Sequence, residues 1–566
     1  MKKIFDSIYF YPLLIILLSL VAIYPCFKKG FYSFHDEAHL ANLYEMVRAI
    51  SSGQFPPRWA PDMSFNYGHP FFNFYYPLPF YLGTLINLSF GASLFWSLKI
   101  VFLISVPLSG LFFYLMMRKF FGKMASFSGS VIYMFTPYRA VDLYVRGAVG
   151  ELLAFVFMPL IIFSFKNLLE KKSINKFVVF SISLAGLILS HNLTAMMFLP
   201  PALLIMLALS VDSLDKKLIK WLAGGFLFGF CLSAYYWLPA ILEKKFMQPG
   251  TPFNPFDNFP FIKQLIIPFW GYGISQWGPG DGMSFQIGIV NLLTIALVLF
   301  LPVFVKNRIQ PKTKPLLIIL LFLFFASVFL MNIRSSFLWR LFPLGEYIQF
   351  PWRFLILTTF ITSFIFGFLE NFLSKNKQYL LLLFSLVSIV LTWNYFKPQN
   401  QILVNDDYYL KRFFADRTSK GKSEVISNDY YNWSEDYLPL TIWTEKRPFS
   451  LPSDKMSVSS GKVEIEEINP TNYKGIVMTD RQTSVEFFGY YFPGWKSWVD
   501  GKEVKPVILK PHGNMSVSVE KGKHEVVFKF EESLIRKISD AISIFSLAIF
   551  GLLYIFFHKK KSFNLQ

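Results

Sequence analysis

The chain has 566 residues, of which 54% are hydrophobic, 19% aromatic and only 16% charged. A soluble globular protein carries about 25% charged residues, so this composition excludes a wholly soluble protein and predicts one that lies mostly in lipid. The net charge of +19 does not indicate nucleic-acid binding, because the basic residues stand in small clusters between apolar segments, as topology determinants do.

Apolar segments of roughly 20 residues predict about 12 membrane-spanning helices. The first, at residues 8–27, lacks a small-residue cleavage site, so we interpret it as a retained span rather than a signal peptide. Cys26 and Cys231 fall in apolar segments without a metal-site spacing. The other spans are expected at residues 96–117, 125–144, 148–165, 177–189, 195–211, 221–242, 285–305, 315–331, 354–372, 379–396 and 538–557.

Clusters of Lys and Arg predict the orientation of these spans. They follow alternate spans, and MKK at the start and HKKK near the end belong to the same set. The positive-inside rule makes that side cytoplasmic, with both termini on it, in a plasma membrane. The longer loops then lie on the outer face, at residues 35–79, 139–151, 190–194, 243–283 and 334–352, together with the region after residue 397.

Three parts are therefore expected. Residues 1–396 form an α-helical polytopic transmembrane module, and residues 534–566 a final transmembrane helix with a basic cytoplasmic tail. Between them, residues 397–533 form an extracytoplasmic β-rich domain, because segments such as VEIEEI, YKGIVM and HEVVFKF are typical of strands. Asp500-Gly501 and Lys521-Gly522 predict hairpin turns, and a small antiparallel sandwich is the expected result.

The first outer loop, residues 28–95, is the most informative. Its residues 36–51 predict a helix with an apolar stripe that lies flat in the membrane interface, and residues 77–90 a partly embedded helix. The stretch 35–79 is dense in ionisable groups and is expected to form one wall of an active site. These groups are His35, Asp36, Glu37, His39, Glu45, Arg48, Arg58 and Asp62.

Asp36 and Glu37 are the candidate catalytic residues. A carboxylate at this helix start could act as a base on an acceptor hydroxyl or hold a divalent cation such as Mg²⁺ or Mn²⁺. It could equally cap the helix. His35 and His39, four residues apart, could join Asp36 in binding a metal, or could simply be hydrogen-bonded; no other cofactor is indicated.

A second group of charges lies in the next outer loop. Arg139, Asp142, Arg146 and Glu151 could form ion pairs that anchor helix ends, or the arginines could bind phosphate. Arg353 begins a span on the same face, so Arg146 and Arg353 could converge on one anion.

Two further sets are candidates for donor binding and for a substrate pocket. Lys244 could meet a lipid phosphate, and Trp59, Tyr67, Tyr76 and His191 could contact sugar, the aromatic residues being equally typical of an interfacial belt.

Two absences restrict the function. The spans carry almost no charge near the middle of the membrane, which argues against an ion-coupled transporter. The sequence also has no P-loop or dinucleotide fingerprint. An activated substrate for an outer-face enzyme must then arrive within the membrane, most simply as a lipid phosphate.

Several motifs together resemble a known bacterial family. They are HDEAHL, TPYRAVDLYVRGAVGELLAFVFMPL, SHNLTAMMFLP, YIQFPWRF, DYLPL and YYFPGWKSWVDGKEV. The family carries the label "6-pyruvoyl-tetrahydropterin synthase-related membrane protein", and the resemblance covers nearly the whole chain. The ending is similar to that of YfhO-like membrane proteins. More distantly, the layout resembles GT-C glycosyltransferases, which take sugars from polyprenyl phosphate.

This resemblance implies a GT-C-like fold and a hexosyl or pentosyl transferase. Its donor would be a polyprenyl-phosphate-linked sugar, and its acceptor a glycan, lipid or protein of the cell envelope. Asp36 matches the first-loop acid of GT-C enzymes, with Glu37 beside it, while Asp142 and Glu151 match the second-loop acids loosely. Arg146 or Arg353 would hold the donor phosphate. A non-catalytic protein for surface-polymer binding or assembly, or a lipid-linked glycan transporter, are the alternatives.

Overall fold

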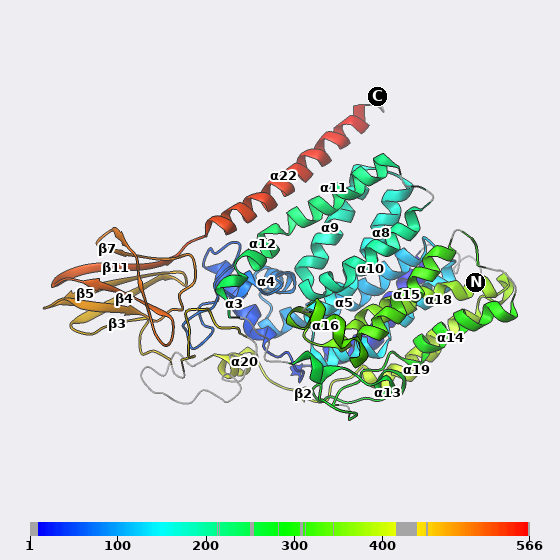
Figure 1. Cartoon of the computed structure of the whole chain (residues 1–566), viewed down its shortest axis with the longest axis horizontal. Coiled ribbons are helices and arrows are strands. Elements are labelled where there is room, and N and C mark those ends of the chain that lie inside the picture. The colour runs from blue at the N-terminus through cyan, green and yellow to red at the C-terminus, as the bar shows by residue number, and fades with distance from the viewer. Residues whose placement is uncertain are drawn as a thin grey trace.

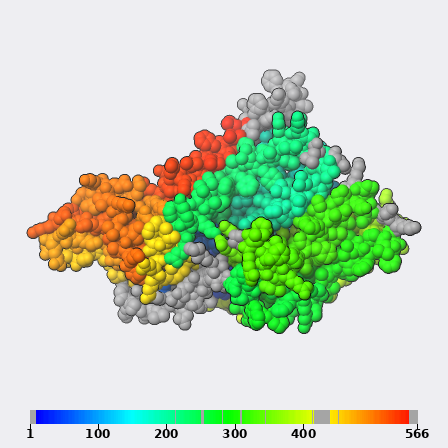
Figure 2. Space-filling model, viewed as in Figure 1, coloured from blue at the N-terminus to red at the C-terminus, as the bar shows by residue number. Residues whose placement is uncertain are grey.

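The computed structural model describes residues 9–211, 213, 215–248, 254–280, 282–305, 309–311, 313–342, 344–414, 438–448 and 451–563. Figure 1 shows a large helical body with the strands of the β-rich domain gathered at one end. The last helix, α22 (Leu534–Phe563), runs from that domain back along the body and packs on α12 (Ala234–Leu242) and α11 (Lys216–Leu232). In the space-filling view the β-rich domain projects from the helical body (Figure 2).

Helices of the described residues confirm a polytopic membrane protein. Two bent pairs could each form one further span: α11 with α12, bent by 74°, and α15 (Lys314–Leu330) with the segment Ile333–Leu341, bent by 91°. Length and composition thus support six to eight spans within the described residues, and the count of twelve stays a prediction. The six single segments are Phe10–Phe27, Leu94–Met117, Val149–Glu170, Asn192–Ser210, Pro351–Phe372 and Lys375–Tyr395.

Shorter helices account for the difference in count. The predicted span 125–144 is divided into α6 (Lys123–Met134), α7 (Pro137–Ala140) and a π-helical turn, η3 (Val141–Arg146). Pro137 lacks a backbone N–H and cannot continue the α6 ladder. Two further apolar helices, α9 (Ile174–Ser190) and α14 (Ile289–Phe304), are each shorter than 18 residues. The spans Pro351–Phe372 and Lys375–Tyr395 contain α18 (Leu355–Phe366) and α19 (Leu380–Thr392). The remaining short helices are α13 (Ile262–Ile266), α16 (Ser336–Leu341), α17 (Leu344–Ile348) and α20 (Asp406–Phe413).

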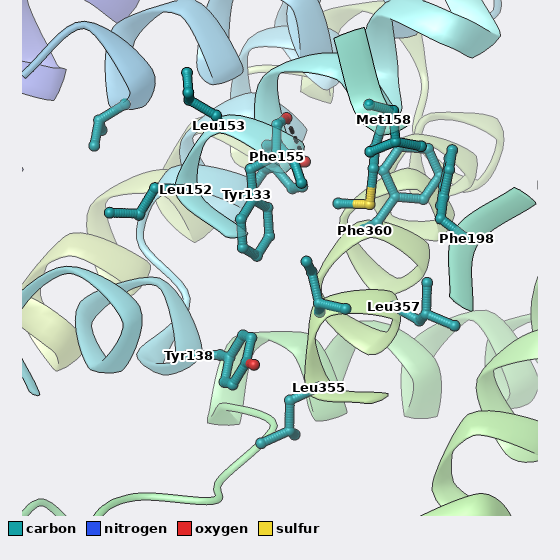
Figure 3. Packing of buried hydrophobic residues seen from close by; sticks show 14 of the residues in the cluster. Tyr133, Tyr138, Leu152, Leu153, Phe155, Met158, Phe198, Leu355, Leu357 and Phe360 are labelled. Atoms are coloured by element: carbon teal, nitrogen blue, oxygen red, sulfur yellow. Dashed lines mark hydrogen bonds between the residues drawn. The ribbon is translucent and has the colours of Figure 1, made fainter. Parts of the chain in front are cut away.

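The core of the body is built around α8 (Val149–Glu170). Figure 3 shows Phe155 of α8, Tyr133 of α6, Phe198 of α10 (Asn192–Ser210) and Phe360 of α18 packed together. The ring of Phe360 lies 5.1 Å from that of Phe198 and 6.2 Å from that of Tyr133. The Tyr133 hydroxyl donates to the carbonyl oxygen of Phe155 at 2.8 Å, so this aromatic core leaves no hydroxyl unpaired there. Tyr138 lies at the edge of the group, toward Leu355 (Figure 3).

The two predicted interface helices are present as α3 (His39–Ser51) and α4 (Leu78–Phe90). However, α3 begins at His39, three residues later than expected, and its N-cap, Ala38, makes no side-chain capping bond. The interpretation of Asp36 as a side-chain cap is therefore wrong. Its backbone carbonyl, rather than its carboxylate, accepts from the N–H of His39 at 3.0 Å.

The β-rich domain consists of two antiparallel sheets, as expected. The ring of Phe487 on one sheet stacks on that of Phe528 on the other at 4.7 Å, so apolar faces meet in a shared core. The first sheet has the order β3 (Met456–Val458), β6 (Thr483–Phe487), β10 (Asn514–Val519), β9 (Val507–Leu509). The second has the order β4 (Lys462–Asn469), β5 (Asn472–Thr479), β11 (Gly522–Phe530), β7 (Trp495–Val499), β8 (Lys502–Val504).

Only one of the two predicted hairpin turns is a hairpin. Asp500-Gly501 joins the paired strands β7 and β8, and both residues have the positive φ, 50° and 78°, that such a tight turn needs. Lys521-Gly522 instead leads from β10 to β11, which belong to different sheets. The chain crosses from one layer of the sandwich to the other at this point, so the hairpin prediction is wrong.

Residues just after 397 pack on the helical body. β2 (Gln401–Ile402) pairs with β1 (Phe31–Tyr32) of the first outer loop. The Asp406 carboxylate accepts from the backbone N–H groups of Leu94 and Phe95 at 2.8 and 3.0 Å, at the start of α5 (Leu94–Met117). The sandwich strands themselves begin at Met456. The predicted domain boundary thus precedes elements that tie this region to the body.

Candidate active site

Two of the loops that we expect on the outer face meet at the backbone of Asp36. The N–H groups of His35 and Asp36 donate to the carbonyl oxygens of Val145 and Arg146, both at 2.9 Å. The next residue, Gly147, has φ +68°, and a Cβ there would lie 2.1 Å from the ring of Phe34. Only glycine allows the loops to approach this closely. The first outer loop is thereby fixed beside the second.

Arg146 lies at the centre of a group of charged side chains next to this contact between the two loops. It donates from Nη1 to Oδ1 of Asp142 at 2.6 Å and from Nη2 to Oε1 of Glu151 at 2.8 Å. The Tyr138 hydroxyl donates to the other Glu151 oxygen at 2.7 Å. Both acids are fully buried. Burial is the largest influence on Asp142 and raises the pKa of its carboxyl, with Arg146 opposing it. These contacts hold Arg146 rigidly in place.

Arg353 approaches the same acid from a different part of the chain. It lies in the 3₁₀ turn η7 (Pro351–Phe354), and its Nε is 3.6 Å from Oε1 of Glu151. Its Nη1 donates to the carbonyl oxygen of Ile348 at 3.0 Å and to Oε1 of Gln349 at 3.1 Å. The side chain keeps 10% exposure. The structure therefore brings Arg146 and Arg353 together, with Glu151 between them.

Asp36 is the most exposed acid of this group. Its side chain is 30% exposed, whereas Asp142 and Glu151 are fully buried. Among the residues that the structure describes, its single ion-pair contact is with Nε2 of His39, at 3.9 Å. Burial lowers the pKa of His39 to about 4, so the ring is neutral at pH 7. We call Asp36, Asp142, Arg146, Glu151 and Arg353 the site cluster.

His191 and Tyr76 lie beside the cluster and not on the surface. The rings of Tyr76 and His191 meet edge to face at 5.0 Å. Nδ1 of His191 accepts from the backbone N–H of Thr194 at 3.2 Å, so the proton of the neutral ring is on Nε2. Burial lowers the pKa of His191 to about 3. Both candidates for the substrate pocket are thus buried next to Glu151.

Other candidates lie elsewhere. Glu37 is buried, with 8% exposure. Arg139 is also buried, donates to Ser109 Oγ at 3.0 Å and stacks 4.1 Å from the centre of the Phe155 ring, so it belongs to the core of the body. Lys244 is half exposed and lies 4.0 Å from Glu346, in the long outer loops.

The predicted metal set of His35, Asp36 and His39 does not assemble. His35 directs Nε2 to the carbonyl oxygen of Tyr272, at 2.9 Å. Because α3 begins at His39, His35 and His39 are not on one helical face, and their i, i+4 spacing has no geometric meaning. Within the described part of the chain, no three His, Cys, Asp or Glu side chains gather as a ligand set. The residues therefore do not form a protein metal site by themselves.

Trp59 and Tyr67 hold the β-rich domain. The ring of Trp59 lies 5.3 Å from that of Trp495 and 5.0 Å from that of Phe530. The Tyr67 ring lies 5.4 Å from that of Tyr490. Both residues are buried in the core that the first outer loop shares with the sandwich. The structure does not place them near the site cluster.

Sequence reasoning missed a second group of charges, of which Arg58, Glu243 and Arg536 are buried and Glu532 and Asp540 partly exposed. We call these five residues the junction cluster. Arg58 donates to Asp540 at 2.6 Å, and Arg536 donates to Glu243 at 3.2 Å. Glu532 lies 3.5 Å from Arg58 and 3.6 Å from Arg536. The available signal was a single charge at the end of an apolar span, as at Glu243, since such a charge is costly unless paired.

Comparisons with known proteins bear on the helical body. Residues 69–237 match the sequence model of the family described as dolichyl-phosphate-mannose-protein mannosyltransferase. An uncharacterized protein of Lactococcus lactis subsp. cremoris is 24% identical over 339 residues, which are 58% of this chain and 54% of that relative. The match therefore spans about half the length of the relative.

Two solved structures align with part of this chain. The arabinofuranosyltransferase AftD from Mycobacteria has a TM-score of 0.49 and 12% identity, over 77% of this chain and 32% of that one. The Archaeoglobus fulgidus oligosaccharyltransferase in its apo form has a TM-score of 0.46 and 14% identity, over 79% of this chain and 62% of that one.

Proposed function

We propose that the protein is a membrane glycosyltransferase that moves a sugar from a polyprenyl-phosphate-linked donor to a cell-envelope acceptor on the outer face. One observation carries this proposal: Asp36, a partly exposed carboxylate without an Arg or Lys partner among the described residues, stands at the edge of a buried arginine pair. A free base beside fixed cations suits a reaction in which a hydroxyl loses a proton and a phosphate leaves.

The family match supports the same class. The matched residues 69–237 contain Asp142, Arg146, Glu151 and His191. Asp36 and Arg353 lie outside the match, so their roles rest on geometry. The narrower resemblance to the pterin-synthase-related family and to YfhO-like proteins stays a prediction. The extracytoplasmic location of the site is likewise proposed from the distribution of Lys and Arg.

The proposed reaction follows from the positions of these groups. The acceptor hydroxyl oxygen forms a bond to the anomeric carbon of the sugar, and its proton passes to the Asp36 carboxylate. The bond between the anomeric carbon and the phosphate oxygen breaks, and the electron pair leaves with the polyprenyl phosphate. Arg353 contacts the developing phosphate charge, while Glu151 and Arg146 hold Arg353 in place.

The proposed transfer balances in atoms and charge without a divalent cation. Asp36 and the mostly buried Glu37 are adjacent carboxylates, and among the described residues no set of three His, Cys, Asp or Glu side chains gathers around them. Mg²⁺ or Mn²⁺ bound with the donor phosphate would take only part of its coordination from the protein.

The test is sugar transfer by the full chain in nanodiscs, with synthetic polyprenyl-phosphate sugars as donors and cell-envelope extract as acceptor. We expect Asp36→Asn to lower turnover by about 10²- to 10⁴-fold, the usual contribution of a general base. The matched control is Asp257→Asn, an exposed acid of another outer loop, which should transfer at the wild-type rate. Wild-type turnover in Asp36→Asn would contradict the site assignment, and absence of transfer by the wild type would contradict the function.

A further inference from the structure

His39 is a buried side chain that the proposed reaction leaves without a role. Its residue is 1% exposed. Neither ring nitrogen makes a hydrogen bond of normal geometry with the described residues, although the backbone of Gly147 lies near enough to raise the pKa of the ring. Burying polar atoms without partners costs free energy, which a structural role in the core would not recover. An apolar side chain would fill this position at lower cost, so the ring calls for another explanation.

The surroundings of His39 fix the plane of its ring. The ring of Phe80 lies 5.8 Å away and that of Tyr75 lies 6.4 Å away, both centre to centre. The charged and titratable groups that face the ring are Asp36, Arg146 and His191. Arg146 is held by its two acids and His191 by Thr194. Asp36 is the group that remains adjustable.

His39 and Asp36 lie slightly too far apart for a hydrogen bond. Nε2 of His39 lies 3.9 Å from Oδ2 of Asp36, beyond a hydrogen bond by about 1 Å. Asp36 is partly exposed and precedes the first turn of α3, so its side chain can rotate. Catalytic hydrogen bonds are often long before substrate binds and shorten in the complex. A small rotation of Asp36 would close this gap.

We propose that His39 is a positioning residue for Asp36. Its ring donates from Nε2 to one carboxylate oxygen when the acceptor is bound, and this contact directs the other oxygen to the acceptor hydroxyl. The inference rests on the proposed function, because it assigns Asp36 the role of base. His39 neither touches the substrate nor exchanges a proton with it.

Two substitutions separate this role from simple packing. His39→Leu keeps an apolar side chain of similar size and removes the donor, while His39→Gln keeps an N–H donor at a similar reach. We expect His39→Leu to lower kcat by about 10- to 100-fold, as misplacement of a reacting group does, with the KM for the donor lipid unchanged. His39→Gln should restore most of the loss.

The pH profile gives the second readout. The hydrogen bond forms in the complex with acceptor, so it acts on the pKa values that the kcat profile reports. A donated hydrogen bond stabilises the charged carboxylate, so its loss in His39→Leu should move the acid limb of the kcat profile to higher pH. His39→Gln should keep the wild-type limb, and thermal unfolding should show that both variants fold. Wild-type kcat and an unmoved limb in His39→Leu would overturn the inference, as would equal losses in the two variants. If the wild type transfers no sugar, the proposed function fails and this inference falls with it.

Discussion

The site cluster and the junction cluster are both groups of arginines and carboxylates, yet they differ in what they leave free. In the junction cluster each of the three acids, Glu243, Glu532 and Asp540, lies within 3.6 Å of a guanidinium nitrogen of Arg58 or Arg536. In the site cluster Glu151 and Asp142 are paired, and Asp36 is not paired with any Arg or Lys among the described residues. Glu532 is as exposed as Asp36, at 30%, so exposure alone does not separate the two clusters. Ion-paired charges hold elements in register, whereas a partly exposed carboxylate without an Arg or Lys partner is available to a substrate.

The two clusters also join different parts of the molecule. The junction cluster connects the first outer loop to α12 and to the start of α22, directly after the last strand of the sandwich. The site cluster connects the same loop to α8 and η7. The first outer loop therefore lies between the sandwich and the site and contacts both.

The largest expected effect on stability comes from breaking the junction cluster. Glu243→Ala removes the acceptor of Arg536 Nε, Ser533 Oγ and Asn73 Nδ2. An uncompensated buried arginine costs about 3–5 kcal/mol, so the full chain should unfold at a clearly lower temperature, with earlier proteolysis of the sandwich. The control is Glu467→Gln, which breaks a surface pair with Arg48 and should cost about 0.2–1 kcal/mol. Equal melting of the two variants would remove the distinction between the clusters.

A smaller effect is expected from the open edge of the site cluster. Arg353→Lys keeps the charge but loses the planar fork that holds phosphate. A lost hydrogen bond to a charged group is worth about 1.5–3 kcal/mol, which corresponds to a KM for the donor lipid raised about 10- to 100-fold. Arg340→Lys, an exposed arginine of the same outer loop, is the control and should leave the KM unchanged. An unaltered KM in Arg353→Lys would exclude Arg353 from donor binding.

Lowering the pH should produce the smallest of these losses of stability, through three buried histidines. Burial lowers the pKa of His39 and His69 to about 4 and that of His191 to about 3, from an ordinary 6.5. Between pH 6.5 and 4 the unfolded chain binds protons that these rings do not. The contribution of these neutral rings to the free energy of unfolding should therefore be complete above about pH 6.5. Below that pH it should fall by up to about 1.4 kcal/mol per histidine per pH unit.

Thermal unfolding across this pH range measures the loss. His69→Gln should make stability less dependent on pH, because one of the three buried rings is gone. A wild-type melting temperature that does not change between pH 7.5 and 4.5 would contradict the neutral, buried state of these histidines.

Local spacing explains why part of the site could be predicted. Asp142, Arg146 and Glu151 lie within ten residues, so their pairing was one of the two interpretations that the sequence allowed. The approach of Arg353 followed from placing it at an outer helix start on the same face. Asp36 stood out as an acid directly after the first span.

The other features depend on long-range packing. Arg58 and Asp540 are 482 residues apart, and neither has a neighbour that indicates the other. His35 was wrongly grouped with His39, because the helix start shifted to His39 when the backbone of residues 35–36 paired with the second outer loop. The crossing at Lys521-Gly522 was wrong for a similar reason, since a short turn signal does not tell a hairpin from a change of sheet.

The most direct test of the account is a structure of the full chain in nanodiscs with a polyprenyl-phosphate sugar bound. We predict that the phosphate oxygens lie at about 2.7–2.9 Å from the guanidinium of Arg353, with the sugar between the phosphate and Asp36. A phosphate bound instead at Lys244, outside the site cluster, with Asp36 still facing solvent, would contradict the central claim.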